Sequence, residues 1–314
     1  MLMRSATRTG RAGFTLIELL VSLVLTSLVA GAIVKLLLRQ QRFYNSTSDL
    51  IQTRQQIRQA AAMLPADLRG ISSSGGDIYA VSDSAVEFRS VFGSSVVCSN
   101  NLGKLSTVPR VLAKGSTMTA WSVLPSVGDS LVVYNDSSSF SASDDAWTRH
   151  QITAVTAVTG NVATGCPTAS GLVQLGDLTG SNPSYQLTLS PAASSKVLVG
   201  AAMRFFKRVR YRIYQDTDTR WYLGFYDCKA GRTPVCNTTR AIAGPFQPYA
   251  ANATSGVQFA YYDSTGAVTA DPLQVARISL IVRGQAGSLL NLSGAGGTTF
   301  RDSLRIEVGL RNRK

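Results

Sequence analysis

The first 70 residues carry two successive patterns of apolar positions. The first is a run of 21 residues, from Phe14 to Val34, in which Glu18 is the single charged side chain. At about 1.5 Å per residue a helix over this run would cover roughly 31 Å, the thickness of a bilayer's hydrocarbon core. We therefore expect a transmembrane segment over residues 14–34.

The second pattern begins after Lys35, where polar residues appear and apolar ones recur at helical spacing. Four apolar positions lie seven residues apart, with two more placed four residues after members of the series: Phe43, Leu50, Ile57 and Leu64, then Ala61 and Leu68. This is one stripe of an amphipathic helix, and no glycine or proline interrupts it before Pro65. Because proline lacks an amide donor, the pattern predicts one helix over residues 14–64, whose distal half packs on a sheet.

Beyond Gly70 the texture changes to short β-type runs separated by loops rich in Ser, Gly and Asn, such as 135–143 and 288–299. The predicted strands are 85–92, 130–135, 151–158, 185–189, 203–214, 221–226, 257–262, 275–283 and 304–310. We expect an α+β fold in which the long N-terminal helix packs on a mainly antiparallel β head. The head would span 65–314, with candidate sub-modules 71–200 and 201–314.

The leader before the apolar run is basic. Arg4, Arg8 and Arg11 precede it without an acidic residue, which by the positive-inside tendency keeps the N-terminus cytoplasmic and exports the head. An ionised Glu18 inside a span costs about 2.5–3.5 kcal/mol, so it should have a partner. Cleavage between Gly13 and Phe14 would create an amine one helical turn away, on the same chain or on a neighbour.

Two simpler interpretations fit less well. A secretory signal peptide has an apolar core of about 7 to 15 residues, shorter than this run. A plain signal anchor explains the length of the run but neither Gly13 nor Glu18.

The run Gly13, Phe14, Thr15, Leu16, Ile17, Glu18 resembles the motif of type IV prepilins and of the pseudopilins of type II secretion. The resemblance implies that residues 1–13 are a leader, removed after Gly13 by prepilin peptidase. It also implies N-methylation of Phe14 and guidance of filament assembly by Glu18. The precursor would sit in inner-membrane lipid as a single-pass protein, and the mature subunit in a pilus at the cell surface.

Later segments resemble the PilW and PulJ branch of the pilin superfamily. These are the candidate hairpin 209–223, the ending 304–313, and Asp67, Leu68 and Arg69 at the end of the first helix. The branch implies a minor pilin that primes assembly or joins the filament with other minor and major pilins, in pilus assembly, adhesion or twitching motility. A type II secretion pseudopilin stays open as an alternative.

Four cysteines, an even number, fit a head exported to an oxidising compartment. Seven residues, with Gly231 and Pro234 among them, separate Cys228 from Cys236, which favours a local disulfide there. Cys98 with Cys166 follows by elimination. A zinc site is disfavoured, because no closely spaced cysteine pair of the zinc-binding kind is present.

The formal net charge is +13, and +10 once the three leader arginines are gone. In the strand predicted over 203–214, alternation places four arginines on one face: Arg204, Arg208, Arg210 and Arg212. Such a stripe is a candidate contact for DNA phosphates, as in a DNA uptake pilus. The alternative is a solvated face that meets acidic partners or anionic lipid.

The sequence offers little for catalysis. It contains one histidine, His150. Two carboxylates follow each other directly in the sequence, Asp144 and Asp145. We expect His150 to lie at the surface or to be incidental, and we predict a protein that is not an enzyme and needs no cofactor.

Overall fold

The computed structural model describes residues 13–112, 115, 117–136, 145–160, 162–228, 236–251, 254–290 and 298–310. The chain divides into two compact units. One comprises the residues up to Gln52 together with Ala286–Phe300. The other comprises Thr53–Gln285 and the residues from Arg301 onward.

The N-terminal helix α1 runs from Leu16 to Leu68, 53 residues, two residues later at its start and four later at its end than predicted. It continues through Pro65, whose ring removes one helical hydrogen bond. The Arg69 amide still donates to the Pro65 carbonyl at 3.1 Å. Leu68, fully buried, holds this last turn, so burial offsets the cost of the proline.

In the first unit α1 presents apolar side chains to its surroundings. Large apolar residues from Phe14 to Leu38 are all exposed by half or more. By length and composition α1 contains a stretch that can cross a membrane, and none of that stretch is buried within the protein. The predicted span 14–34 overlaps α1 from Leu16 onward.

The described strands form one sheet of thirteen. Their bounds are β1 (Ile78–Ser82), β2 (Ala85–Asn101), β3 (Lys104–Thr107), β4 (Ala120–Trp121), β5 (Ser130–Asn135), β6 (Ala146–Val158), β7 (Ser184–Ser190), β8 (Ala202–Gln215), β9 (Trp221–Asp227), β10 (Asn237–Phe246), β11 (Val257–Tyr262), β12 (Arg277–Leu290) and β13 (Thr298–Gly309). Each strand predicted from the sequence has a counterpart here, and the antiparallel α+β fold is confirmed. Most of the predicted loop 135–143 falls outside the described residues.

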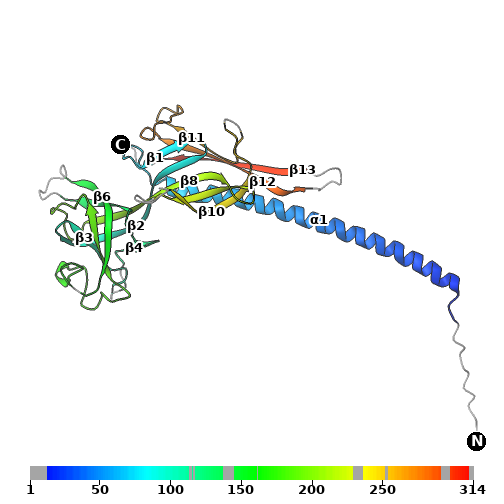
Figure 1. Ribbon diagram of the computed structural model, residues 1–314, viewed down its shortest axis with the longest axis horizontal. Coiled ribbons are helices and arrows are strands. Elements are labelled where there is room, and N and C mark those ends of the chain that lie inside the picture. Colours follow the sequence, from blue (N-terminus) through cyan, green and yellow to red (C-terminus); the bar gives the residue numbers. More distant parts are fainter. Residues whose placement is uncertain are drawn as a thin grey trace, which may run out of the picture. The chain divides into compact units, whose positions relative to one another are not determined.

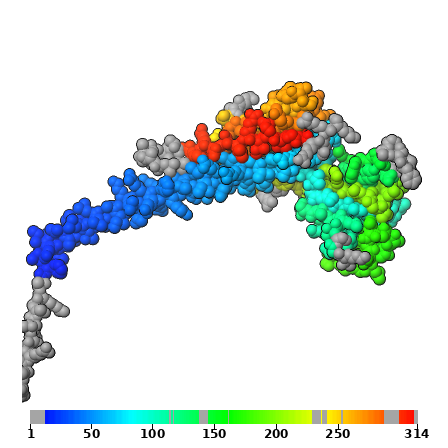
Figure 2. All heavy atoms as spheres, turned by 180° about the vertical axis from the view of Figure 1, so that it is seen from behind, coloured from blue at the N-terminus to red at the C-terminus, as the bar shows by residue number. Residues whose placement is uncertain are grey.

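Strand pairing follows the order β1-β2-β3-β7-β6-β5-β8-β9-β10-β12-β11, with β13 on β12 and β4 on β2. A further pairing joins β2 to β8, so β2, β3, β7, β6, β5 and β8 close into a ring of six antiparallel strands. In Figure 1 the labels β2, β3 and β6 lie together, whereas β8 is labelled beside α1; the cyan to green body in Figure 2 holds most of the ring. Buried apolar side chains such as Leu131, Leu187 and Phe205 form the core of this ring.

The strands outside the ring carry a second core, on which the distal turns of α1 pack. Ile57, Ala60, Leu64 and Leu68 are buried there among side chains of β2, β8, β11 and β12. The stripe prediction is thus confirmed at Ile57, Leu64 and Leu68. It is wrong at Phe43, which is 59% exposed and belongs to the first unit.

Both cores draw on the same two long strands. Phe88 of β2 and Val209 of β8 belong to the core under α1, whereas Val97 and Phe205 of these strands belong to the core of the ring. Each core therefore contains residues from both predicted sub-modules, 71–200 and 201–314.

Close contact between α1 and β12 requires a glycine. A Cβ built on Gly284 would lie 2.7 Å from Thr53 and 2.8 Å from Ile57, closer than side chains tolerate. Two polar side chains on α1 then reach β10: Gln59 donates to the Ile242 carbonyl at 3.1 Å. The Gly244 amide donates to Gln56 at 3.1 Å. Backbone groups of β10 that lack a strand partner are satisfied in this way.

Tyr211 ties the end of α1 to β8. Its hydroxyl donates to Asp67 at 2.5 Å, and its ring stacks on Phe88 at 5.9 Å between centroids. Burial of the phenol, reinforced by the negative charge of Asp67, raises the pKa of Tyr211 far above its usual range. The folded state therefore holds the phenolic proton more strongly than the unfolded chain does.

We expect the free energy of unfolding to be unaffected by this group below pH 10, the usual tyrosine pKa, and to fall as pH rises further, because the unfolded chain then releases the proton first. Tyr211→Phe should make the fall of the unfolding free energy with pH shallower, by up to about 1.4 kcal/mol per pH unit. Urea unfolding of the full chain in micelles between pH 8 and 11 measures it. Tyr44→Phe, at an exposed ring, is the control, and identical slopes for the two variants would contradict the assignment.

Candidate functional site

The start of α1 is organised by two side chains of the apolar run. Gly13, Phe14 and Thr15 are not helical, and the helix begins at Leu16. The amide and the hydroxyl of Thr15 each donate to the Glu18 carboxylate at 3.3 Å. In return the Glu18 amide donates to the Thr15 hydroxyl at 3.3 Å. This reciprocal pair is a capping box, with Thr15 as N-cap and Glu18 as the third helical residue.

The capping box gives the carboxylate of Glu18 a partner within the uncleaved chain. Helix N-termini leave four amides unpaired, and in hydrocarbon each such amide costs several kcal/mol. Glu18 satisfies one of them and also sits at the positive end of the helix dipole. The partner predicted for Glu18 is the amine of a cleaved chain. Thr15 was not predicted, although the spacing Thr-x-x-Glu is the recognised signature of a capping box.

Other hydroxyls of the apolar stretch are also satisfied locally. Thr26 donates to the Ser22 carbonyl at 2.7 Å, and Ser27 to the Val24 carbonyl at 2.8 Å. Such bonds to the preceding turn let hydroxyl side chains enter an apolar environment at little cost. With these hydroxyls satisfied, the one charged side chain in the stretch from Phe14 to Val34 is Glu18.

Residues 8–34 match the family model described as the prokaryotic N-terminal methylation motif. The chain carries a prepilin-type methylation motif. Neither the curated proteins nor the solved structures contain a match to the chain. The motif, of the class found in type IV prepilins and pseudopilins, implies processing by prepilin peptidase. With the apolar helix exposed as described, the chain is consistent with an inner-membrane prepilin.

Apart from the prepilin motif, the head contains two disulfides. They join Cys98 to Cys166 and Cys228 to Cys236, the pairing favoured by the cysteine spacing. The first ties β2 to the segment before the short 3₁₀ helix Thr168–Ser170, with both cysteines fully buried. Closing a loop of 68 residues stabilises the fold by about 4 kcal/mol through the entropy of the unfolded chain.

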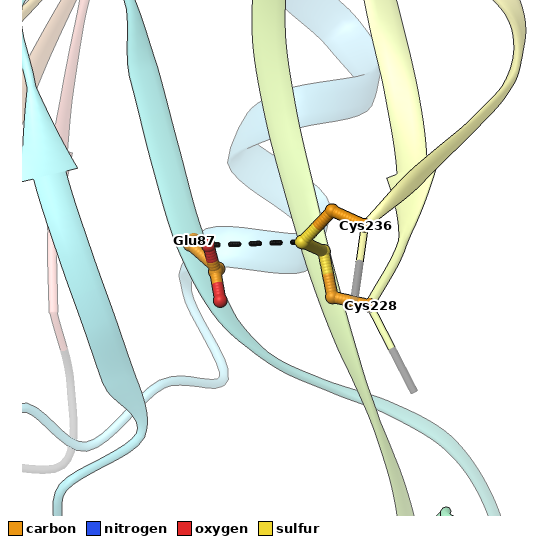
Figure 3. A group of neighbouring side chains, drawn as sticks. All are labelled: Glu87, Cys228 and Cys236. Carbon is orange, nitrogen blue, oxygen red and sulfur yellow. Dashed lines mark hydrogen bonds between the residues drawn. A yellow bond between two sulfur atoms is a disulfide. The ribbon is translucent and has the colours of Figure 1, made fainter. Parts of the chain in front are cut away.

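The second disulfide lies beside a buried carboxylate. Figure 3 shows Glu87 of β2 facing the sulfur atoms, with Cys236 Sγ 3.9 Å from Glu87 Oε2. The ligand atoms of Glu87, Cys228 and Cys236 lie within 4.8 Å of one another, the spacing of a metal site. Both sulfurs are bonded to each other, and metal ligation needs thiolates. The arrangement therefore does not favour a cation.

Instead, Glu87 binds two arginines of the predicted basic stripe. Its side chain is 2% exposed and forms ion pairs with Arg208 and Arg210, whose Nε donates to Oε2 at 2.7 Å. A buried carboxylate shared by two cations leaves a net positive charge at the surface. A buried carboxylate without a cation is costly, so Glu87 holds these two partly exposed arginines beside β2.

The other arginines of the stripe are placed differently. Arg204 lies over the Trp147 ring at 5.0 Å, and Arg212 is exposed at the far end of β8. The alternation predicted for this strand is confirmed, since Met203, Phe205, Val209, Tyr211 and Ile213 are buried. Arg149 of β6 adds a cation that sequence reasoning missed. Arg149 and Arg89 both form ion pairs with the buried Asp77. Desolvation lowers the pKa of Arg149, and the nearby positive charge of Arg89 lowers it further.

The residues weighed for catalysis have structural roles where they are described. His150 is buried, contrary to the expected surface position, because Nδ1 donates to the Pro191 carbonyl at 2.7 Å and Nε2 lies 3.0 Å from the Thr148 hydroxyl. Asp145 accepts a hydrogen bond from Tyr134 at 2.5 Å. Asp144 lies outside the described residues. The prepilin class consists generally of structural, non-enzymatic proteins.

We expect Thr15→Ala to remove both side-chain bonds of the capping box and to destabilise the helix start by about 1 kcal/mol. Amide hydrogen exchange of the full chain in micelles should then show the Glu18 amide exchanging roughly fivefold faster. Thr15→Ser keeps a hydroxyl at the same position and should exchange like the natural chain. Equal exchange in the alanine and serine variants would refute the capping role.

Proposed function

We propose that the chain is a minor pilin of a type IV pilus, processed by prepilin peptidase and incorporated into the filament or priming it. The observation that carries the proposal is the helix surface around the motif: apolar, exposed over more than 20 residues, and charged only at Glu18. A surface of this kind is stable in lipid or in the helical core of a filament. Its neighbours would be other minor and major pilins.

Cleavage changes the partner of Glu18. Cutting after Gly13 places a cationic, N-methylated amine at Phe14, next to the Thr15 that caps the helix in the uncleaved chain. A cation and a carboxylate attract strongly in an apolar medium, so Glu18 of one subunit would pair with such an amine and direct its neighbour into register. The leader therefore keeps the assembly contact from forming before processing.

The size of the chain and the late segments of the head favour a minor over a major pilin. The mature chain of 301 residues, 314 minus 13, is large for the repeating unit of a pilus. Its late segments resemble the PilW and PulJ branch. The hairpin of β8 and β9 is one such segment, and the register from Val209 with Asp227 to Gln215 with Trp221 supports it. A pseudopilin of a type II secretion system is the alternative within the same class.

We expect Glu18→Ala to leave cleavage largely intact but to impair incorporation, because the carboxylate that pairs with the Phe14 amine is gone. Gly13→Leu should block processing, since the peptidase recognises the small residue before the cut. Immunoblots of cell and sheared-filament fractions separate the two effects. Blocked processing shows as the slower mobility of the uncleaved chain, and impaired incorporation shows as loss of the chain from the filament fraction. Normal filament content of the Glu18→Ala chain would refute the assembly role.

The basic stripe supports a second candidate, a minor pilin that binds DNA in an uptake pilus. Among the described residues Arg204 and Arg212 form no ion pair with a carboxylate, and Arg149 lies two strands from Arg204 across β5. Arginines on neighbouring strands of one face can meet several phosphates at once.

We expect the full chain in lipid nanodiscs to bind duplex DNA at low salt. Arg204→Ala with Arg212→Ala should reduce the slope of log K against log salt by roughly 1.8, about 0.9 per lost phosphate contact. Arg220→Ala, in the β8–β9 turn, is the control. Absence of binding at low salt would rule out the DNA candidate and favour a face for acidic partners.

A further inference from the structure

A groove of about 650 Å³ lies on the strand ring, between β2, β4 and β8. Residues of β2 and β4 form its apolar walls, and two arginines complete it. Its principal lining residues are Val91, Phe92, Arg110, Val111, Trp121 and Arg204. The prepilin motif and the disulfides do not touch it, and neither proposed function uses its apolar part.

The apolar walls combine one buried anchor with exposed aliphatic side chains. Trp121 is 6% exposed and packs edge-on against Phe205 at 5.6 Å, whereas Val91 is 49% and Val111 59% exposed. Tryptophan and arginine are enriched among the side chains that dominate the energy of protein–protein contacts. Exposed aliphatic side chains around such an anchor gain by being covered.

The charge of the groove is uniformly positive. Arg110 and Arg204 line it, and none of its described lining residues is acidic. Arg204 stacks on Trp147, which holds the guanidinium plane while its N–H groups stay available to an acceptor. Neither arginine forms an ion pair with a carboxylate among the described residues. The complementary ligand is an anion, and a carboxylate can accept two parallel hydrogen bonds from a guanidinium.

Hydrogen bonds hold the groove walls in place. Asn182 donates to the Val111 carbonyl at 2.7 Å and accepts from the Val111 amide at 3.2 Å. Thr119, another lining residue, donates to the Val108 carbonyl at 2.6 Å and lies 2.7 Å from the Ser95 hydroxyl. A surface that is ordered before binding loses less entropy when a ligand arrives.

The groove borders an open strand edge. Among the described strands β4 pairs with β2 alone, through Gly93 with Trp121 and Ser94 with Ala120. An exposed edge offers main-chain groups to an added strand, and neighbouring pockets then select its side chains.

We infer that this groove docks an extended segment of a partner protein, in which acidic and apolar side chains alternate along one face. The segment adds to the edge of β4, its apolar side chain covers Val91 and Val111, and its carboxylate meets Arg110 and Arg204. This docking is independent of Glu18 and of filament incorporation, so each can fail while the other holds.

The probe is a fluorescein-labelled octapeptide that repeats Glu-Glu-Val-Val, because alternate residues of a strand share a face and both faces then carry both types. We expect it to bind the full chain in nanodiscs, measured by anisotropy against empty nanodiscs. Lys-Lys-Val-Val should not bind, and Glu-Glu-Ser-Ser should bind at least about fivefold more weakly. No binding of the first peptide up to 1 mM, or equal binding of the lysine peptide, would overturn the proposal.

The variant Arg110→Glu with Arg204→Glu should weaken binding of the acidic peptide about tenfold or more and should gain binding of the lysine peptide. That gain shows that the variant is folded. Arg220→Glu with Arg301→Glu removes the same charge outside the groove and should bind like the natural chain. If both double variants weaken binding equally, general charge attraction explains the result and the groove proposal is wrong.

Discussion

The antiparallel ladder between β2 and β8 is the interaction on which the head depends. It runs from Ala85 with Arg212 to Val96 with Ala202, and it belongs to both cores. On one face it places Phe88 and Tyr211 under α1, and along its length it closes the six-strand ring. On the opposite face it sets Glu87 opposite Arg210 and beside Arg208. Losing this ladder would open the ring and remove the support of the helix together.

Buried carboxylates offset part of the basic charge on this side of the head. Each buried carboxylate on this face serves two guanidinium groups: Glu87 serves Arg208 and Arg210, and Asp77 serves Arg89 and Arg149. Four cations are thereby held by two anions, which leaves positive charge directed outward. Other cations carry the two proposals: Arg204 and Arg212 would meet phosphates, and Arg110 and Arg204 would meet a carboxylate.

The strands missed by sequence reasoning share a cause. β3 and β4 are four and two residues long, too short for a period of two to be visible, and they form only because β2 offers an edge. β1 is five residues whose pairing is interrupted by a register shift, and β10 contains both Gly244 and Pro245, residues typical of turns. In each case partner strands, rather than local preference, stabilise the extended conformation.

The sequence alone determined three features of the protein: an apolar helix of membrane length, the motif from Gly13 to Glu18, and nine of the strands. These are local patterns whose physics is complete within a few residues. Tertiary structure decided what depends on distant partners. It carried α1 through Pro65 because Leu68 is buried, and it buried His150. It also closed the ring through β2 and β8, and placed Arg110 beside Arg204 in one groove. Most of these contacts join residues that lie far apart in the sequence, as His150 and Pro191 do. Local periodicity holds no information about such pairs.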